Sequence, residues 1–463
     1  MQINDFFPKL NSKTCFYGVS LNSQKIKKGD LFFTFNGNLD HTLEAIKNGC
    51  VAVFSPRPLK IDFEVHIIAD IKETLAFLLS KISHFFLKNV ILIGITGTDG
   101  KTTTTNILNQ LLIENYNPIS IGTNGIYTTD KHFKTKNTTI DIVQFYDLIN
   151  LYHTNKNVYI TEVSSEGILD KRILYLEYDF LIFTNLTHEH LNTHKNMENY
   201  YQTKKSFFKQ NKTKHAKLIN TDDYYGKRLF DELDGSKISF GIKTGMYQAR
   251  NIRLNRFYSS FDLYFEDVFI ETFTTSITTS YNIYNLLPAI ITCLLLKVNI
   301  SHIKKKLPEL KFPKGRFNLY HNKKSFVIDF AHTPNSLLQL LLNLKHLYSK
   351  KLILVLGAQG EKDRTKRFLM GHYATKYASH VIFTSEDAKN EDLNHIIYDL
   401  IKDVYSQNYQ IIYSRKQAIK EAFKIATSND MVVICGKGFE SYEINSNQKR
   451  RHNDYLCAKL FNT

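Results

Sequence analysis

Short apolar runs that end in polar residues alternate with amphipathic helical stretches over most of the chain. The runs NVYITEVSS, YDFLIFTNLT and HAKLINTDD have this form in the middle of the sequence, and SFVIDFAHTP, KLILVLGAQG, HVIFTSED and DMVVICGKG repeat it toward the end. Buried strands of parallel sheets are continuous apolar runs, and helical crossovers join them. The pattern therefore predicts an α/β fold with parallel sheets and a site at the strand ends.

The same pattern divides the chain into three segments. Residues 1–88 alternate short apolar runs with Gly and Asn turns and end in a helical pattern, KETLAFLLSKISHFFL, which predicts a small α/β domain. Residues 89–314 hold a strand, Gly-rich turn and helix pattern, then a β-rich stretch, SSFDLYFEDVFIETFTTSITT, and the helix SYNIYNLLPAIITCLLL. Residues 315–463 hold four buried-type strands with amphipathic helices between them, which predict a Rossmann-like sheet.

Length and composition set limits on the class of protein. A chain of 463 residues has room for two or three domains, and no apolar run approaches the roughly 20 residues of a membrane-spanning helix. The N-terminus lacks the order of a signal peptide and the five cysteines lie singly, so we expect a cytoplasmic protein with no membrane partner. The net charge of +16 comes from lysine spread along the chain, so we expect no nucleic-acid partner.

A Gly-rich turn follows the apolar run NVILI in the stretch GITGTDGKTTTTNIL, residues 94–108. Such a turn between a strand and a helix presents backbone N–H groups and a positive dipole end to an anion. Lys101 can reach the β and γ phosphates of a nucleotide, and the Thr102 hydroxyl can bind Mg²⁺. Ile95 stands where the Walker spacing asks for Gly, so the loop is a shortened variant. The predicted phosphate-binding residues are Gly97, Thr98, Asp99, Gly100, Lys101, Thr102 and Thr103.

The shortened loop TGTDGKTTT resembles that of the Mur ligases, which form amide bonds from a carboxylate and an amine at the expense of ATP. Further motifs recur in this family's order and spacing over essentially the whole chain: TEVSSEGILDKR, FTNLTHEHLNTH, MENYYQTKKSFF, NIYNLLPAI, GRFN, IDFAHTPNSL, GAQGEKDRTKR, TSEDAKNED and GKGFESY. They are similar to the branch that adds a diamino acid to UDP-MurNAc-L-Ala-D-Glu. The resemblance implies three domains: an N-terminal uridine-binding α/β domain, a central P-loop ATPase-like domain with a mainly parallel sheet, and a C-terminal Rossmann-like domain that binds the incoming amino acid.

The resemblance also implies a catalytic centre formed by Lys101, Glu162, His190 and Lys204. Lys204 falls on the position that the family carbamylates, which turns an ammonium into an anionic metal ligand. Considered alone it would pass for a surface lysine, and Lys205 lies beside it, but the register against the family selects Lys204. The metal ligands implied for Mg²⁺ are Thr102, Glu162, His190 and carbamylated Lys204.

Binding residues for ATP and for the UDP-substrate follow from the same resemblance. The ATP residues beyond the phosphate loop are Asn282 and Asn285 for adenine, Asp329 for the ribose hydroxyls, His332 near the phosphates, and Arg316, which faces the nucleotide. The UDP-substrate residues are Asn22, Ser23, Asn137, Thr138, Thr139, Ser164, Ser165 and Arg172. In the uridine-binding part, Asn22 and Gln24 replace the family's usual Asp and Arg.

Arginine is scarce relative to lysine in this chain, yet four arginines fall within the family's motifs. They are Arg172, Arg316, Arg367 and Arg415. A planar guanidinium binds carboxylate or phosphate through two parallel hydrogen bonds, which a lysine cannot do. We therefore expect these four side chains to face anions.

The incoming amino acid is expected in the C-terminal domain. The residues implied for it are Lys362, Glu386, Asp387, Lys389, Gly436 and Glu440. The family's meso-diaminopimelate enzymes carry Asp-Asn-Pro-Arg where this chain has residues 386–389, and an Arg at position 362. Both lysines keep positive charge for a distal carboxylate, so we favour meso-diaminopimelate over L-lysine. Phe439 and Glu166 replace residues that are usually His in the family.

The activity implied is that of an ATP-dependent amide ligase of peptidoglycan precursor synthesis that works through an acyl phosphate. ATP and Mg²⁺ are the expected cofactors, the partners are small-molecule substrates, and we expect a monomer. One alternative is another Mur or folylpolyglutamate-type ligase. A second is a nucleotide-binding protein that has lost catalysis, which the replacements at Asn22, Glu166 and Phe439 would suit.

Overall fold

The computed structural model describes residues 1–88, 90–152, 154, 156–211, 213–348, 350–446 and 448–462, with the side chains of all of these except 85 and 86. The chain forms two compact units. The first comprises residues 1–94, 113–181 and 207–215, and the second comprises residues 95–112, 182–206 and 216–463. Three elements contribute residues to both units: β5 (Ile91–Thr96), β10 (Phe180–Phe183) and α9 (Met197–Gln210).

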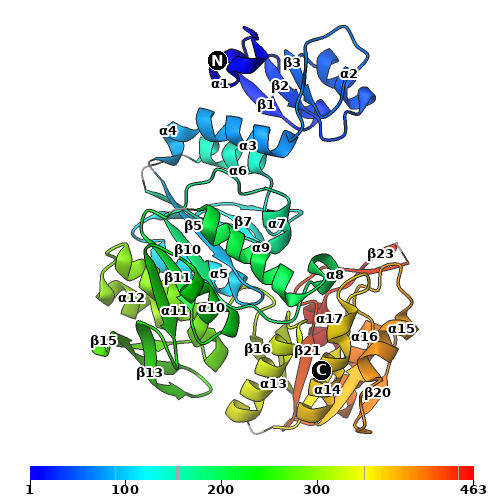
Figure 1. Ribbon diagram of the computed structural model, residues 1–463. Coiled ribbons are helices and arrows are strands. Elements are labelled where there is room, and N and C mark those ends of the chain that lie inside the picture. The colour runs from blue at the N-terminus through cyan, green and yellow to red at the C-terminus, as the bar shows by residue number, and fades with distance from the viewer. Residues whose placement is uncertain are drawn as a thin grey trace. The chain divides into compact units, whose positions relative to one another are not determined.

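The first unit begins with a four-stranded parallel sheet, coloured blue in Figure 1. Its strands follow chain order: β1 (Gly18–Ser20), β2 (Asp30–Phe33), β3 (Ala52–Ser55) and β4 (Val65–Ile67). Later strands of this unit lie in the order β9 (Asn157–Glu162), β6 (Asn117–Gly122), β7 (Gly125–Tyr127) and β8 (His132–Phe133). Its helices are α1 (Ile3–Phe6), α2 (Leu39–Lys47), α3 (Ile71–Ile82), α4 (His84–Leu87), α6 (Ile142–Leu151) and α7 (Ser165–Leu169).

The N-terminal part of the second unit continues the predicted strand and helix alternation. Its strands lie in the order β10, β11 (Ala216–Asn220), β12 (Lys237–Gly241), β13 (Tyr247–Leu254), β14 (Ser259–Phe265) and β15 (Val268–Thr275), and the last three pair antiparallel. Its helices are α5 (Lys101–Leu112), α8 (Leu191–His194), α10 (Tyr224–Glu232), α11 (Ser280–Leu295) and α12 (Ile300–Lys306). Helix α11 packs against α5, which follows the predicted phosphate loop.

The C-terminal sheet has six strands where the sequence pattern predicted four. Their order is β16 (Asn318–His321), β17 (Ser325–Asp329), β21 (Met431–Cys435), β18 (Leu352–Leu356), β19 (His380–Phe383) and β20 (Tyr409–Ile411). The additional strands, β16 and β20, are short edge strands that are not fully buried, so neither forms the apolar run of a central strand. The helices are α13 (Pro334–Tyr348), α14 (Arg367–Tyr377), α15 (Leu393–Ile401), α16 (Arg415–Ile425) and α17 (Asp454–Phe461), and β22 (Tyr442–Asn445) and β23 (Gln448–Arg451) form a separate hairpin.

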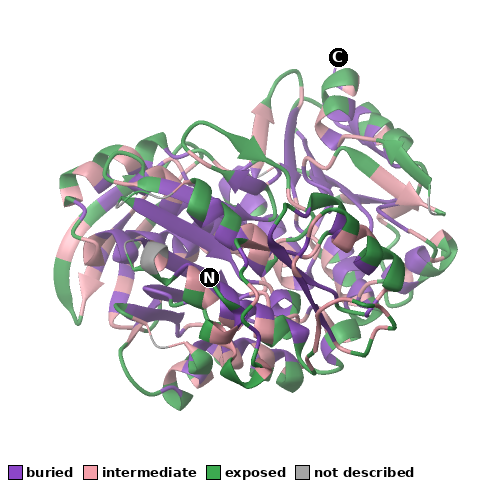
Figure 2. Cartoon of the chain, turned by 90° about the horizontal axis from the view of Figure 1, so that it is seen from above, coloured by how far each residue is buried: buried purple, intermediate pink, exposed green. Residues whose placement is uncertain are grey.

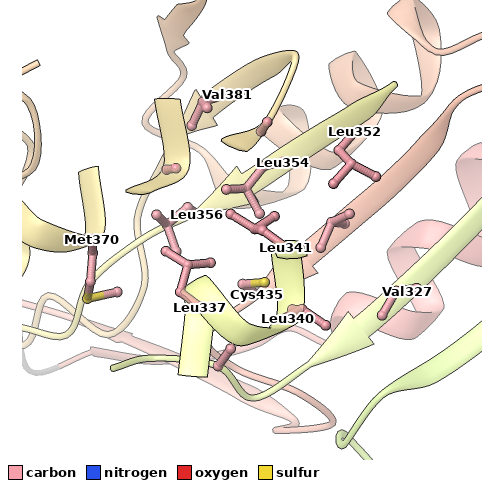
Figure 3. Close-up of a cluster of buried hydrophobic side chains, with 14 of the residues drawn as sticks. Val327, Leu337, Leu340, Leu341, Leu352, Leu354, Leu356, Met370, Val381 and Cys435 are labelled. Atoms are coloured by element: carbon pink, nitrogen blue, oxygen red, sulfur yellow. The ribbon is translucent and has the colours of Figure 1, made fainter. Parts of the chain in front are cut away.

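Alternate residues of the C-terminal strands enter two hydrophobic cores. On β18, Leu352, Leu354 and Leu356 pack with side chains of α13, α14 and α15, and Ile353 and Val355 pack with those of α16 and α17. Figure 3 shows the first of these cores, and the strands are largely purple, which marks burial, in Figure 2. Helices thus cover both faces of a mainly parallel sheet, which confirms the predicted α/β class. Within the described residues, no helix has the length and apolar character needed to span a membrane.

Candidate functional site

The predicted phosphate loop lies between β5 and α5. Asn185, just after β10, holds it: the Thr98 N–H donates to the Asn185 carbonyl and the Asp99 N–H to the Asn185 side-chain oxygen, each at 2.9 Å. Gly100 has a φ of +89°, and a Cβ there would lie 2.3 Å from the Asn285 side-chain oxygen. Glycine is therefore required at position 100, both for the backbone conformation and for the close approach of α11.

Two lysines lie at the carbonyl side of this loop. Lys101 donates to the carbonyls of Gly97 and Thr98, both at 2.8 Å. Lys204, from α9, is 1% exposed and donates to the Thr96 hydroxyl and the Gly97 carbonyl, both at 3.1 Å. In the described part of the chain no carboxylate pairs with Lys204, and burial together with the Lys101 charge holds the pKa of its amine well below the ordinary value. A lowered pKa favours the neutral amine, which is the form of lysine that reacts with CO₂.

His190 completes this group, which we call the cation cluster: Lys101, His190 and Lys204. It precedes α8 with a φ of 59°, in the left-handed region. Burial, and then the charges of Lys101 and Lys204, lower the pKa of its imidazole to about 3. The ring is therefore neutral near pH 7, which is the state that binds metal ions.

The predicted metal ligands are distributed over both units. Thr102, at the start of α5, is buried, and with His190 and Lys204 it belongs to the second unit, whereas Glu162 belongs to the first. Over the described residues, no three His, Cys, Asp or Glu side chains gather in a way that could hold a metal ion. Of the four predicted ligands, only Glu162 and His190 are of these residue types. Metal binding by this set would therefore also require the Thr102 hydroxyl and the carbamate of Lys204.

A cavity of about 460 Å³ in the second unit adjoins the phosphate loop. The predicted ATP residues that line it are Asp99, Gly100, Thr103, Asn282, Asn285, Arg316 and Asp329. Those that do not line it are Gly97, Thr98, Lys101, Thr102 and His332. The cavity thus brings together residues that lie more than two hundred positions apart in the sequence.

Polar side chains in this cavity are fixed by one another. Asn285 donates to the Asn282 side-chain oxygen at 2.6 Å, one helical turn away on α11. The buried carboxylate of Asp329 accepts the backbone N–H groups of Phe317 at 2.6 Å and Ala331 at 2.7 Å, and burial raises its pKa. The Arg316 guanidinium lies over the Phe330 ring, 4.6 Å from its centroid. These contacts hold amide, carboxylate and guanidinium groups at one cavity.

The strip predicted for the sugar nucleotide forms a connected network in the first unit. Thr139 donates to the Glu162 carbonyl at 2.9 Å and lies 3.1 Å from the Ser164 hydroxyl. Arg172 donates to the Thr139 carbonyl at 2.9 Å and to Asp170 at 2.7 Å. In the same unit the Glu162 carboxylate accepts the backbone N–H and the hydroxyl of Thr123, each at 3.1 Å, and that hydroxyl lies 3.1 Å from the Thr138 hydroxyl. Asn137 is exposed.

The residues predicted for uridine make local structural contacts. Asn22 accepts the Gln24 N–H at 2.9 Å and begins a short 3₁₀ turn. The Ser23 hydroxyl is buried and donates to Glu44 at 2.5 Å. Asn22 therefore caps the 3₁₀ turn that follows β1, and Ser23 joins this turn to α2.

Residues predicted for the incoming amino acid form a second group, the carboxylate cluster: Glu386, Asp387 and Glu440 around the buried Lys437. Lys437 donates to Asp387 at 2.7 Å and to Glu440 at 2.9 Å. Glu386 is fully buried, and neither of its carboxylate oxygens has a hydrogen-bond partner among the described residues. A Cβ at Gly436 would lie 2.2 Å from one of these oxygens. Burial raises the pKa of Glu386 to about 7, against the lowering effect of Arg415 and Lys437.

The other predicted acceptor residues are less constrained. Lys389 is half-buried in a left-handed conformation (φ 54°), and its N–H donates to the Ile444 carbonyl at 2.9 Å. The charge of Lys362 acts on His190 and lowers its pKa, so it lies toward the cation cluster. Phe439 stacks on Tyr455 with ring centroids 5.3 Å apart, which gives it a packing role, and Glu166 is exposed.

Several residues near these groups were not predicted from the sequence. Tyr281 and Tyr284 line the cavity from α11. Each lies next to a predicted adenine-binding residue, Asn282 or Asn285, and this proximity in the sequence could have indicated them. Glu189 and Lys366 form a buried ion pair at 2.8 Å. Glu189 lies in the motif THEHLNTH and Lys366 in EKDRTKR. Because the two motifs are far apart in the sequence, neither motif alone indicates this ion pair.

Models of the Mur ligase middle domain and of the Mur ligase glutamate ligase domain match residues 95–293 and 315–438. The UDP-N-acetylmuramoyl-L-alanyl-D-glutamate–2,6-diaminopimelate ligase of Aquifex aeolicus is 35% identical over 439 residues, 92% of this chain and 89% of that protein. A solved structure of a ligase of the same name is 25% identical with a TM-score of 0.67, over 96% of this chain and 94% of that one. MurF ligase from Thermotoga maritima in complex with ADP is 17% identical with a TM-score of 0.69, over 97% of each chain, a likeness of fold alone.

Proposed function

The chain belongs to the Mur ligase family, and from this premise we propose that it is the ATP-dependent ligase that adds meso-diaminopimelate to UDP-MurNAc-L-Ala-D-Glu in peptidoglycan precursor synthesis. The observation that carries the activity is the buried, carboxylate-free Lys204 beside the phosphate loop. A binding protein without catalysis would gain nothing from such a costly buried amine. The choice of substrates rests on the likeness to diaminopimelate ligases along almost the whole chain.

The reaction would proceed in two steps. The side-chain carboxylate of D-Glu takes the γ-phosphoryl group of ATP, which gives an acyl phosphate and ADP. An amino group of the diamino acid then attacks the acyl carbon, inorganic phosphate leaves, and the nitrogen loses its proton as the amide forms. Lys101 would hold and neutralise the transferred phosphoryl group, and the Asn185-braced loop would orient it, so catalysis rests on positioning and charge.

The residues proposed for Mg²⁺ are Thr102, Glu162, His190 and Lys204 as its carbamate. The neutral imidazole of His190 and the depressed pKa of Lys204 suit these roles, because a metal ligand must offer a lone pair or an anion. When bound, Mg²⁺ supplies further neutralisation of the phosphate charge. The remaining ATP contacts are proposed for the cavity residues Asn282, Asn285, Arg316 and Asp329, with His332 near the phosphates.

The sugar nucleotide is proposed to bind residues of the first unit: Asn22, Ser23, Asn137, Thr138, Thr139, Ser164 and Arg172. The acceptor is proposed to bind the carboxylate cluster, with its ammonium toward Glu386 and Glu440 and its distal carboxylate toward Lys389 and Lys362. Two cations for the distal carboxylate favour diaminopimelate over L-lysine. We further propose domain limits of 1–88, 89–314 and 315–463, a monomer, and a cytoplasmic location, which suits small-molecule nucleotide substrates.

Phosphate release tests the proposal directly. The purified protein is incubated with ATP, Mg²⁺ and UDP-MurNAc-L-Ala-D-Glu in three parallel reactions, which contain meso-diaminopimelate, L-lysine or no amine. Phosphate release is measured, and the product is identified by mass spectrometry. We expect release and a tripeptide product that depend on meso-diaminopimelate. Dependence on L-lysine would overturn the acceptor, and no release with either amine would overturn the activity.

A further inference from the structure

The loop that carries His190 is held on both sides of that residue by one short segment of the C-terminal region. The His188 ring lies 2.7 Å from the Thr365 hydroxyl. The Leu191 backbone N–H donates to Asp363 at 3.2 Å. Residues 363–366 therefore contact the loop on either side of His190.

The strongest of these contacts is a buried ion pair. Lys366 and Glu189 are each 3% exposed, and the Lys366 ammonium lies 3.0 and 2.8 Å from the two carboxylate oxygens of Glu189. It also donates to the His332 carbonyl at 2.7 Å, so its three N–H groups have three acceptors. Removing one member of such a pair leaves a buried charge unpaired, so the contact resists opening.

His190 itself has a conformation that needs external support. Its φ of 59° lies in the left-handed region, which is unfavourable for a residue with a Cβ and persists only where the surroundings fix the backbone. The fixed neighbours are Glu189 on one side and Leu191 on the other. The contacts of segment 363–366 are thus placed where they determine the direction of the His190 side chain.

We propose that Asp363, Thr365 and Lys366 form a clamp that positions His190 for the metal ion. These three are positioning residues, since none is among the ligands proposed for the metal. The inference rests on the proposed function, because it takes His190 as a metal ligand. The new element is that residues of the C-terminal region orient His190. Metal binding and the contact of residues 363–366 with the His190 loop therefore depend on each other.

Two measurements on the full-length protein test the clamp without relying on ligation. Hydrogen exchange followed by mass spectrometry reports the opening of residues 188–194, and electron paramagnetic resonance of Mn²⁺ in the presence of ADP reports metal affinity. We expect Lys366→Met to speed exchange in this loop roughly tenfold and to weaken Mn²⁺ roughly tenfold, as loss of a charged buried contact should. Lys366→Arg keeps the positive charge, so it should retain part of the protection of the loop from exchange and part of the Mn²⁺ affinity.

Arg367→Met is the matched control. Arg367 is also a buried cation, but its ion pairs among the described residues are with Glu391 and Asp399, which lie outside the His190 loop. It should leave loop exchange and Mn²⁺ affinity near wild type even if global stability falls. Equal effects of the two variants, or unchanged exchange and Mn²⁺ affinity in Lys366→Met, would overturn the clamp.

If Lys366→Met does not fold, the isosteric Glu189→Gln replaces it with the same expected direction. A wild type that binds no Mn²⁺ in the presence of ADP would also overturn the inference. A wild type that binds Mn²⁺ but fails to ligate would instead overturn the proposed function alone.

Discussion

Two buried regions of the second unit each hold an ionisable side chain, an amine in one and a carboxyl group in the other, that makes no ion pair among the described residues. In the cation cluster, Lys204 is buried with no carboxylate paired to it in the described chain. In the carboxylate cluster, Glu386 is buried and both of its oxygens lack hydrogen-bond partners among the described residues. Other buried charges nearby are paired, as Lys366 is with Glu189 and Arg415 with Asp454. Buried ionisable side chains are thus paired at these neighbouring positions, whereas Lys204 and Glu386 are not.

The contrast between the two regions indicates which kind of ligand group each region can bind. An unpaired buried charge costs stability, because the charged form loses its hydration without gaining a partner. A region that gathers basic side chains suits anions such as phosphate groups or a carbamate. A region with a surplus carboxylate suits an ammonium. This is the complementarity that a ligase needs if it joins an activated carboxylate to an amine, and each substitution below removes one side of it.

Lys204→Met should give the largest effect. The variant cannot form a carbamate, so we expect the ligation rate to fall at least roughly a thousandfold, with ADP binding retained. The protein prepared without CO₂ should unfold at a higher temperature than wild type, because a buried amine with an unfavourable charged form is replaced by an apolar side chain. Ligation kinetics, ADP calorimetry and thermal unfolding measure the three outcomes.

Lys205→Met is its control, since Lys205 is adjacent in sequence but pairs with Glu232 at 2.6 Å on the surface side of α9. It should keep near-wild-type ligation. Loss of activity in the Lys205 variant with an active Lys204 variant would move the carbamate by one residue and remove the cation cluster from the comparison.

Glu386→Gln should give a pH-dependent gain in stability. The pKa of Glu386 is raised to about 7 from an ordinary 4.5, so the folded protein holds a proton that the unfolded chain releases between these values. Wild-type stability is therefore lost as pH rises from 4.5 to 7. The glutamine variant lacks this loss, so it should be more stable by up to about 3 kcal/mol at pH 8 and equal to wild type below pH 4.5. Denaturant unfolding at pH 5 and pH 8 measures the difference.

Glu391→Gln provides a contrast of opposite sign. Hydrogen bonds from Arg367 hold the pKa of Glu391 at about 2, so its contribution is present above pH 4.5 and is lost only as pH falls toward 2. Its effect should be a constant destabilisation between pH 5 and 8. If Glu386→Gln were likewise flat over this range, Glu386 would be ionised and compensated, and the two regions would no longer differ as described.

Much of the fold could be predicted because its signals are local. The apolar runs of β17, β18, β19 and β21 and the Gly-Lys-Thr turn are contiguous in the sequence, and the structure has them as predicted. The edge strands β16 and β20 could not be predicted, because three or four partly exposed residues form no apolar run.

The environment of individual side chains was much harder to predict. Arg367 and Arg415 face anions as expected, but these are carboxylates of the protein itself, Glu391 and Asp399 for the first and Asp454 for the second. An arginine in a motif cannot reveal whether its anion is a ligand or a distant residue of the same chain. The burial of Lys204 and its lack of a paired carboxylate likewise arise only when β5, the phosphate loop and α9 come together.

Lys389→Ala should give the smallest effect and is the sharpest test of acceptor choice. If Lys389 faces the distal carboxylate of diaminopimelate, its loss should raise the KM for that amine roughly tenfold, as expected for one partly exposed charge pair within a binding site. The KM for UDP-MurNAc-L-Ala-D-Glu should change little. L-lysine has no distal carboxylate, so the low ligation activity expected with L-lysine should not fall further in the variant.

The exposed Lys420 on α16 supplies the control, because Lys420→Ala removes the same charge from the chain and should change neither KM. Equal losses with both amines would mean that Lys389 supports the pocket without reading the distal carboxylate. The selectivity would then have to come from Lys362, whose charge acts on His190. The carboxylate cluster would in that case recognise only the ammonium, which is the part of the acceptor that both diamino acids share.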